Sequence, residues 1–317
     1  AQPRPRDEAI QRLDEAVTAL VRSQDIVGLT VVVMQDDRVV YERAWGFSDL
    51  EARIPMEVGT AMQIGSISKI PTAVAIVCLS EQGKLSLDDP ISEHLPSLPA
   101  AMASITVRQL LEMTSGIPEY VRHPEYVARD LDFSSPGEWT RNHLRDFIYR
   151  LPLDFTPGTR WAYSSSNYSL LGGIIEAVTG ESYESYVTRI LFSKPAHRAF
   201  QPLHHGPADP PREAQGYARG KQGHERSRPV NPEMVVADGL WSTDAATLAR
   251  WFQALASSNL VSESVLDEMR RPARMPNGTQ IPYGAGVILF PVAGLERFGH
   301  GGSMPGFLSE VGFYRAT

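Results

Sequence analysis

The sequence predicts a mixed α/β fold of the α+β class, in which an antiparallel β-sheet flanked by helices is assembled from both ends of the chain. Valine-rich, strand-like segments lie near the N-terminus, and strand-like alternation returns near the C-terminus. Between them, residues 85–280 have the pattern of helical segments broken by proline-rich loops. We therefore assign residues 1–60 and 281–317 to a sheet region, and residues 61–280 to an inserted, mainly helical region.

The N-terminal part is predicted to be a helix followed by a β-hairpin. Residues 7–23 place a set of apolar side chains on one helical face, namely Ile10, Leu13, Val17, Leu20 and Val21. Two valine-rich strands follow, Gly28 to Met34 and Arg38 to Trp45. The polar turn Gln35-Asp36-Asp37 joins them.

The rest of the chain supplies one long central helix, two long loops and three more strands. The helix runs from Ser66 to Gln82 and stops at Gly83, a good C-terminal signal. Two loops rich in proline extend over residues 118–136 and 202–232, and each is either a wall of an active site or a surface insertion. The last strands are Gly286 to Val292, Leu295 to Phe298 and Phe307 to Tyr314.

The composition excludes several classes of function. Of the 317 residues, 42% are hydrophobic, yet no apolar run approaches the roughly 20 residues of a transmembrane helix. A net charge of -7 argues against nucleic-acid binding, which needs positive charge to neutralise phosphates. The single cysteine, Cys78, excludes an internal disulfide and a cysteine-based metal cluster. The start, Ala1 to Arg6, resembles the mature end left by a cleaved signal peptide, so we expect a periplasmic or secreted protein.

Ser66 and Lys69 form the first candidate catalytic pair. They lie three residues apart in Ser66-Ile67-Ser68-Lys69 at a helix start, so their side chains share one face. A desolvated lysine with a lowered pKa can take the proton of a serine hydroxyl and make it a nucleophile. A chain of this length contains about one S-x-x-K by chance, and this chain contains one. Pro71 lacks the N–H of a regular first turn, so that turn must be irregular.

Two other segments carry candidate residues. Tyr163 lies in Trp161-Ala162-Tyr163-Ser164-Ser165-Ser166-Asn167 before an apolar helix, where its phenol can relay a proton. The alternative is a half-buried tyrosine beside serines that cap a helix.

Near the C-terminus, the run from Phe298 to Phe307 ends one predicted strand and begins the next. Its glycines, including Gly302, let a substrate approach the strand, and its polar groups are His300 and Ser303. The Ser303 N–H can join that of Ser66 as an oxyanion donor, although a glycine-rich hairpin turn explains the pattern equally well.

Together these three sites resemble the superfamily of penicillin-binding proteins and class C β-lactamases, whose hallmarks are S-x-x-K, Y-x-N and K/H-x-G in this order. Further segments look like those of the family: residues 83–90, 110–118, 157–159 and 283–286. The resemblance implies a β-lactamase/transpeptidase-like fold with the active site in a cleft between the sheet and helical regions. It also implies acylation of Ser66, with Lys69 as base and Tyr163 as proton relay, and no metal or organic cofactor. His300 would supply polarity to the far wall.

The sequence departs from the family pattern in three places. Ser165 stands where asparagine usually holds the acyl-side amide of the substrate, and Gly301 stands where β-lactamases carry a hydroxyl for the carboxylate. Asn167 and Ser303 are the residues that can compensate. Family members also continue beyond the position of Thr317 with a strand between the N-terminal hairpin and the strand at 307–314. We expect that gap to be filled by a further segment or by a partner chain.

The missing donors weaken the case for penicillins and favour simpler esters. The sequence therefore predicts a serine hydrolase acting on a small ester, amide or peptide. A carboxylesterase or a D-amino-acid peptidase resembling D-alanyl-D-alanine carboxypeptidases ranks first, and a class C-like β-lactamase second. A non-catalytic scaffold or binding module of penicillin-binding-protein type is the third possibility.

Overall fold

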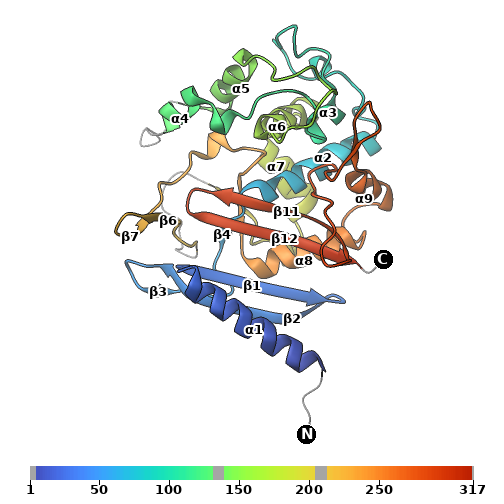
Figure 1. The fold of residues 1–317 in the computed structure, drawn as a ribbon. Coiled ribbons are helices and arrows are strands. Elements are labelled where there is room, and N and C mark those ends of the chain that lie inside the picture. Colours follow the sequence, from blue (N-terminus) through green and yellow to red (C-terminus); the bar gives the residue numbers. More distant parts are fainter. Residues whose placement is uncertain (1–4, 131–138, 204–212, 316–317) are drawn as a thin grey trace.

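The computed structural model describes residues 5–130, 139–203 and 213–315, and it confirms the mixed α/β fold (Figure 1). The longer helices are α1 (Pro5–Ser23), α2 (Lys69–Glu81), α5 (Arg141–Arg150), α6 (Ser165–Thr179), α8 (Ala245–Ala256) and α9 (Glu263–Arg270). The shorter ones are α3 (Val107–Leu111), α4 (Pro124–Asp130) and α7 (Tyr183–Val187). Single helical turns occur at η1 (Gly65–Ser68), η2 (Ile91–Glu93), η3 (Tyr120–Arg122), η4 (Thr188–Phe192), η5 (Pro195–His197) and η6 (Pro232–Met234).

The strands form several small antiparallel sheets. The two long hairpins are β1 (Gly28–Gln35) with β2 (Arg38–Asp49), and β11 (Glu296–Met304) with β12 (Phe307–Arg315). The short strands are β3 (Ile54–Pro55), β4 (Met62–Gln63), β5 (Gln201–Pro202), β6 (Tyr217–Gly220), β7 (Gly223–Arg226), β8 (Trp241–Thr243), β9 (Ala273–Arg274) and β10 (Gln280–Ile281). The middle of the chain shows no strand pattern in its sequence, because pairings of two to four residues are too short to show alternation.

The predicted N-terminal helix and hairpin are present with nearly the predicted bounds. Asp36 and Asp37 form the turn with positive φ angles of 49° and 62°. Helix α1 is held on β2 by two side-chain bonds, from the Tyr41 hydroxyl to Asp14 and from the Trp45 indole to Thr18. Two side chains one turn apart near the middle of α1 therefore attach the helix to the hairpin.

The two long hairpins do not share a hydrogen-bonded ladder in the described part of the chain. The sequence predicted one sheet, and the structure has two separate ones that both contact helix α8. In Figure 1 the β11–β12 hairpin lies above the β1–β2 hairpin, with α8 beside them.

The predicted strand from Gly286 to Val292 is wrong. Only isolated bridges form there, Ile288 with Gly299 and Val292 with Leu295. Gly286 has a φ of 72°, and Pro291 provides no N–H, so a continuous ladder cannot pass through this segment. The glycine-rich run instead extends β11 through Met304, and the turn comes only at Pro305-Gly306.

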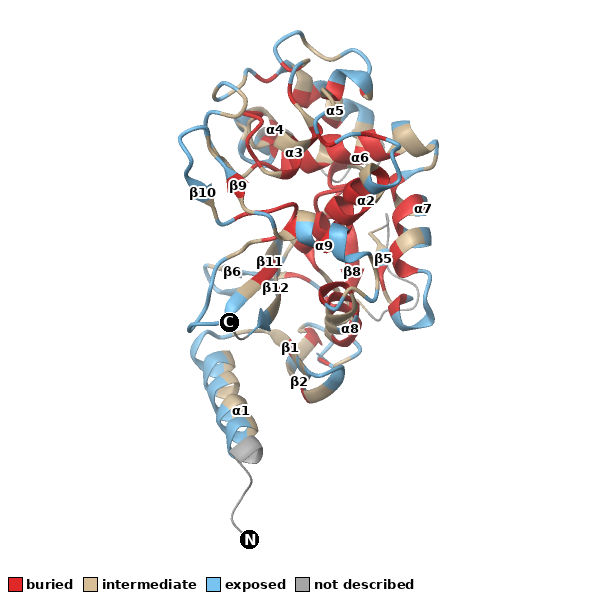
Figure 2. Ribbon diagram, turned by 90° about the vertical axis from the view of Figure 1, so that its right-hand side faces the viewer, coloured by how far each residue is buried: buried red, intermediate tan, exposed pale blue. Residues whose placement is uncertain are grey.

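The buried core lies in the helical part of the molecule. Figure 2 shows α2 and the first turns of α6 largely buried, whereas α1 and the first hairpin are mostly intermediate or exposed. Helix α2 buries every residue from Lys69 to Val77 and also Leu79, and its contacts include α6 and α9. No helix among the described residues is long and apolar enough to cross a membrane. The first residues of α2 thus lie within the buried core.

Candidate active site

Ser66 lies on η1, one turn before α2, and Lys69 is the first residue of that helix. The chain turns there as a 3₁₀ helix before it becomes an α-helix, which matches the irregular first turn predicted from Pro71. Lys69 Nζ lies 3.0 Å from Ser66 Oγ. A hydroxyl and an amine at this distance can exchange a proton directly.

The Lys69 ammonium is completely enclosed by protein. Its side chain has no exposed surface, and Nζ donates to Ser66 Oγ, to Ser165 Oγ at 3.2 Å and to the Asp238 carbonyl at 3.1 Å. An ammonium group has three hydrogens, and here three acceptors surround it. This geometry suits the protonated form of the lysine.

The electrostatics of Lys69 differ from the sequence-based expectation of a lowered pKa. Burial lowers the pKa of Lys69, but attraction to Tyr163, Asp238 and Glu119 outweighs that effect, so the pKa lies above its ordinary value. The expectation considered burial and neighbouring positive charge. It omitted the acidic groups that the fold brings to the lysine from distant parts of the chain.

Tyr163 lies in the extended segment just before α6. Its ring faces Lys69, with Nζ 5.1 Å from the ring centroid, and lies 6.0 Å from the His300 ring. Tyr163 is half-buried, as its alternative interpretation also required. The structure thus brings the three residues Ser66, Lys69 and Tyr163 together from two segments.

Ser165 begins α6 and occupies the position opposite Ser66. Its hydroxyl accepts from Lys69, and its backbone N–H donates to Glu119 Oε2 at 3.0 Å. Asn167 does not replace the missing asparagine, because its amide is used inside the protein. Its Oδ1 accepts from Ser115 Oγ at 2.5 Å, and its Nδ2 contacts Met113 Sδ.

His300 lies on β11 and is 3% exposed. Burial and the nearby charge of Lys69 lower the pKa of His300 to about 4. Its Nδ1 lies 2.5 Å from the Gly301 carbonyl, which can only accept, so this nitrogen carries the proton. His300 is therefore neutral at pH 7, and it supplies polarity but no charge.

Gly65 and Gly302 allow β11 to lie against the nucleophile. Gly65 has a φ of 50°, and a Cβ there would stand 2.8 Å from the Ser303 nitrogen. A Cβ on Gly302 would stand 1.9 Å from the Ile64 carbonyl. Two facing glycines thus place the backbone of Ser303 beside the turn that carries Ser66, as an oxyanion pair requires.

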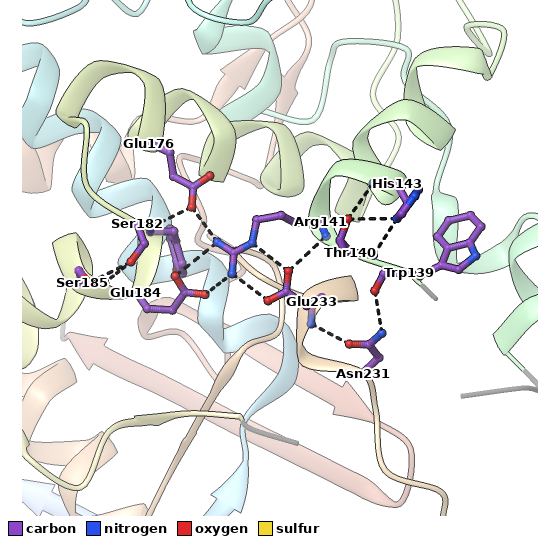
Figure 3. Close-up of polar contacts among 11 residues, drawn as sticks. Trp139, Thr140, Arg141, His143, Glu176, Ser182, Glu184, Ser185, Asn231 and Glu233 are labelled. Atoms are coloured by element: carbon purple, nitrogen blue, oxygen red, sulfur yellow. Dashed lines mark hydrogen bonds and ion pairs between the residues drawn. The ribbon is translucent and has the colours of Figure 1, made fainter. Parts of the chain in front are cut away.

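Two acidic residues that the sequence did not single out also belong to the site, Glu119 and Asp238. Asp238 is buried, and Glu233, five residues before it in the chain, is bound by Arg141 (Figure 3). Arg141 pairs with Glu176 of α6 at 2.7 Å, Glu184 of α7 at 2.8 Å and Glu233 of η6 at 3.1 Å. Helices α6 and α7 therefore hold the segment that leads from η6 to Asp238.

The family model described as Beta-lactamase matches residues 13–317 of this sequence. The chain belongs to the beta-lactamase family. Membership confirms the resemblance inferred from the motifs and makes the protein a relative of serine β-lactamases and penicillin-binding proteins. Ser66, Lys69 and Tyr163, from which the resemblance was inferred, lie together in the structure.

Individual beta-lactamase family members are similar over most of this chain. The structure of the octameric penicillin-binding protein homologue from Pyrococcus abyssi has a TM-score of 0.83 at 26% identity, covering 96% of this chain and 70% of that one. A D-stereospecific amidohydrolase from Streptomyces sp. has a TM-score of 0.77 at 29% identity, covering 91% and 86%. Protein flp of Staphylococcus aureus is 29% identical over 60% of this chain, and the matched region spans only 38% of that relative's length.

Proposed function

We propose that the protein hydrolyses amides, short peptides and esters of D-amino acids through an acyl-enzyme at Ser66, in the manner of D-alanyl-D-alanine carboxypeptidases. The observation that carries the proposal is the enclosed pair of Ser66 Oγ and Lys69 Nζ, 3.0 Å apart and beside Tyr163. A structural serine and lysine at a helix start have no need of a fully buried charge, because burying a charge is unfavourable. The same site suits simple carboxylic esters.

The reaction begins when Ser66 Oγ forms a bond to the substrate carbonyl carbon. Its proton passes to the free-amine form of Lys69, and the backbone N–H groups of Ser66 and Ser303 stabilise the resulting oxyanion. The bond to the amine or alcohol then breaks, Tyr163 delivers its proton to that leaving group, and the Lys69 ammonium reprotonates Tyr163, so Lys69 is a free amine again. Water then attacks the acyl carbon while its proton passes to Lys69, the bond to Ser66 Oγ breaks, Lys69 returns the proton to Ser66 Oγ, and the carboxylic acid leaves.

Glu119 supports a substrate that carries a free amino group. Its carboxylate accepts the Ser165 N–H, so it lies at the wall where the acyl side of the substrate binds. A carboxylate there attracts the ammonium of an amino acid and adds no contact to a plain ester. The similarity to the Streptomyces D-stereospecific amidohydrolase supports the D configuration.

A surface hollow beside the site offers room for the rest of the substrate. Trp161 and Met275 contribute apolar surface to it, and Arg160 contributes charge. The Trp161 ring lies 5.9 Å from Tyr283, whose ring in turn neighbours Tyr163 and His300. A hydrophobic side chain or a leaving group with a carboxylate fits this hollow.

The test compares kcat/KM for D-phenylalanine amide, L-phenylalanine amide, a nitrophenyl ester and nitrocefin. We expect the D-amide to exceed the L-amide by about a hundredfold or more, and the ester to exceed nitrocefin. Mass spectrometry after labelling with a fluorophosphonate should find the adduct on Ser66. A higher kcat/KM for nitrocefin than for the other substrates would contradict the proposal and indicate a β-lactamase. Absence of labelling at Ser66 would indicate a non-catalytic scaffold.

A further inference from the structure

Asp238 has no role in the reaction as described above, yet its carboxyl group is among the most enclosed charged groups in the molecule. It is 5% exposed and comes from the segment between η6 and β8. Its backbone carbonyl accepts from Lys69 Nζ at 3.1 Å, which places the residue directly against the candidate base. A buried carboxyl group needs partners for both oxygens if it is ionised.

The two carboxyl oxygens of Asp238 differ in their hydrogen-bond partners. Oδ2 lies 2.9 Å from the Tyr120 hydroxyl. Oδ1 is buried, and no residue in the described part of the chain forms a hydrogen bond with it. A carboxylate with one unsatisfied oxygen is unfavourable in a protein interior, so this arrangement stabilises the protonated carboxyl group.

The Tyr120 hydroxyl has a single proton but two neighbours that can accept it. It lies 2.7 Å from the Met234 carbonyl and 2.9 Å from Asp238 Oδ2. When Asp238 is ionised, Tyr120 donates to one of them and the other loses its bond. When Asp238 is protonated, its O–H donates to the Tyr120 oxygen and Tyr120 donates to Met234, so both bonds form. The contact thus has two stable hydrogen-bond arrangements.

We propose that the Asp238 carboxyl group is a positioning residue that takes up and releases a proton beside Tyr120, and that its negative charge favours the ammonium form of Lys69. This inference rests on the proposed role of Lys69 as base. When the carboxyl group loses its charge, Lys69 releases its proton more readily.

The neighbouring charges support this coupling. Burial raises the pKa of Asp238 to about 6, against the opposing attraction of Lys69. Attraction to Asp238 is in turn one of the causes that raise the pKa of Lys69. The other titratable groups around Asp238 are Tyr120 and Glu119 on the η3 side and Tyr183 on α7, and Lys69 also faces Tyr163 and His300.

The test follows Lys69 directly by NMR of protein with ¹³C-labelled lysine. The sequence contains only four lysines, Lys69, Lys84, Lys194 and Lys221, so four side-chain signals are expected. In Asp238→Asn, which keeps the backbone carbonyl, the titration midpoint of Lys69 should fall by at least one pH unit. The wild-type signal should also show a smaller inflection near pH 6 that Asp238→Asn lacks.

Two further variants keep the test decisive. Asp146→Asn removes an equal charge from the surface of α5, where the side chain is 69% exposed, and should leave Lys69 unchanged. Tyr120→Phe removes the hydroxyl that is the partner of both forms of the Asp238 carboxyl group, so the inflection near pH 6 should move away from its wild-type position. If Asp238→Asn shifts Lys69 no more than Asp146→Asn does, the proposal is wrong. The NMR midpoint needs no turnover, so a protein that shows the shift but hydrolyses nothing refutes the proposed function alone.

Discussion

Two sides of the site, here called the α wall and the β wall, face Ser66, and different kinds of group form them. The α wall consists of Lys69, Ser165 and Asp238, whose buried polar groups bond to one another across 169 residues of sequence. The β wall is the strand from His300 to Ser303, where glycines and backbone atoms approach the nucleophile and the one titratable side chain is neutral at pH 7. Proton transfer therefore depends on the α wall, and substrate shape depends on the β wall.

The largest expected effect comes from removing the nucleophile that both walls face. Ser66→Ala should lower kcat for a nitrophenyl ester by roughly 10⁴-fold or more, as removal of a nucleophilic serine does. Ser68→Ala is the matched control. Its Oγ accepts the Trp241 N–H, so its loss costs about 1–3 kcal/mol of stability but leaves turnover. A Ser66→Ala protein with wild-type kcat contradicts the mechanism.

The second prediction concerns the pH dependence of the rate. Because the pKa of Lys69 lies above its ordinary value, the ammonium predominates at neutral pH and the free amine increases tenfold with each pH unit. We expect kcat/KM for a chemically limited ester to rise steadily between pH 6 and 9, with an apparent pKa that belongs to the coupled Lys69–Tyr163 system. A flat profile over this range would be incompatible with Lys69 as the base.

The third prediction compares one residue of each wall, His300 and Asp238, by their effects on how the free energy of unfolding depends on pH. His300 has a folded pKa of about 4, below its ordinary 6.5, so the unfolded chain binds more protons and stability falls as the pH drops through this window. Asp238 has a folded pKa of about 6, above its ordinary 3.8, so the folded chain binds more protons and stability rises as the pH drops. Each shift corresponds to about 3 kcal/mol. In the wild type the two effects nearly cancel.

Single substitutions of His300 and Asp238 should reveal the two opposing pH dependences of stability. Between pH 6.5 and 4.5, urea unfolding of His300→Gln should show stability rising by about 2 kcal/mol relative to wild type. Asp238→Asn should show stability falling by a similar amount. Variants whose stabilities follow the wild-type pH dependence would mean that neither group is shifted in the folded protein.

The sequence predicted the parts of the site that are local and missed those that arise from long-range contacts. The closeness of Ser66 and Lys69 follows from their spacing within one helical turn, and the irregular turn follows from Pro71 two residues later. Asp238 carries no local signal, because its proximity to Lys69 depends on the path of the chain from η6. The raised pKa of Lys69 was missed for the same reason.

The fold shows the same division. The helix and hairpin at the N-terminus followed from periodicity and turn chemistry, and their bounds agree closely with the structure. The strand expected from Gly286 to Val292 has the right composition, but positive φ angles at Gly286, Ala293 and Gly294 turn the chain out of a ladder. Alternation alone cannot reveal such turns.

The smallest expected effect alters the β wall alone. A Cβ at Gly301 would meet Glu310 Oε2 at 2.9 Å and otherwise only the Ser309 carbonyl at 3.7 Å, so Gly301→Thr displaces the end of one flexible side chain. Gly302 offers no such space, since its Cβ would meet the Ile64 carbonyl at 1.9 Å. Threonine also suits a strand. The new hydroxyl can therefore be added without disturbing the approach of β11 to Ser66.

A hydroxyl at residue 301 can donate to a substrate carboxylate, and a hydrogen bond to a charged group contributes about 1.5–3 kcal/mol. A β-lactam brings that carboxylate, whereas a nitrophenyl ester does not. Gly301→Thr should therefore raise kcat/KM for nitrocefin by about tenfold or more and change that for the ester by less than about twofold. If both values fall together, the threonine only crowds β11. If neither changes, another group already serves the carboxylate, and Gly301 does not determine the preference for esters and peptides over β-lactams.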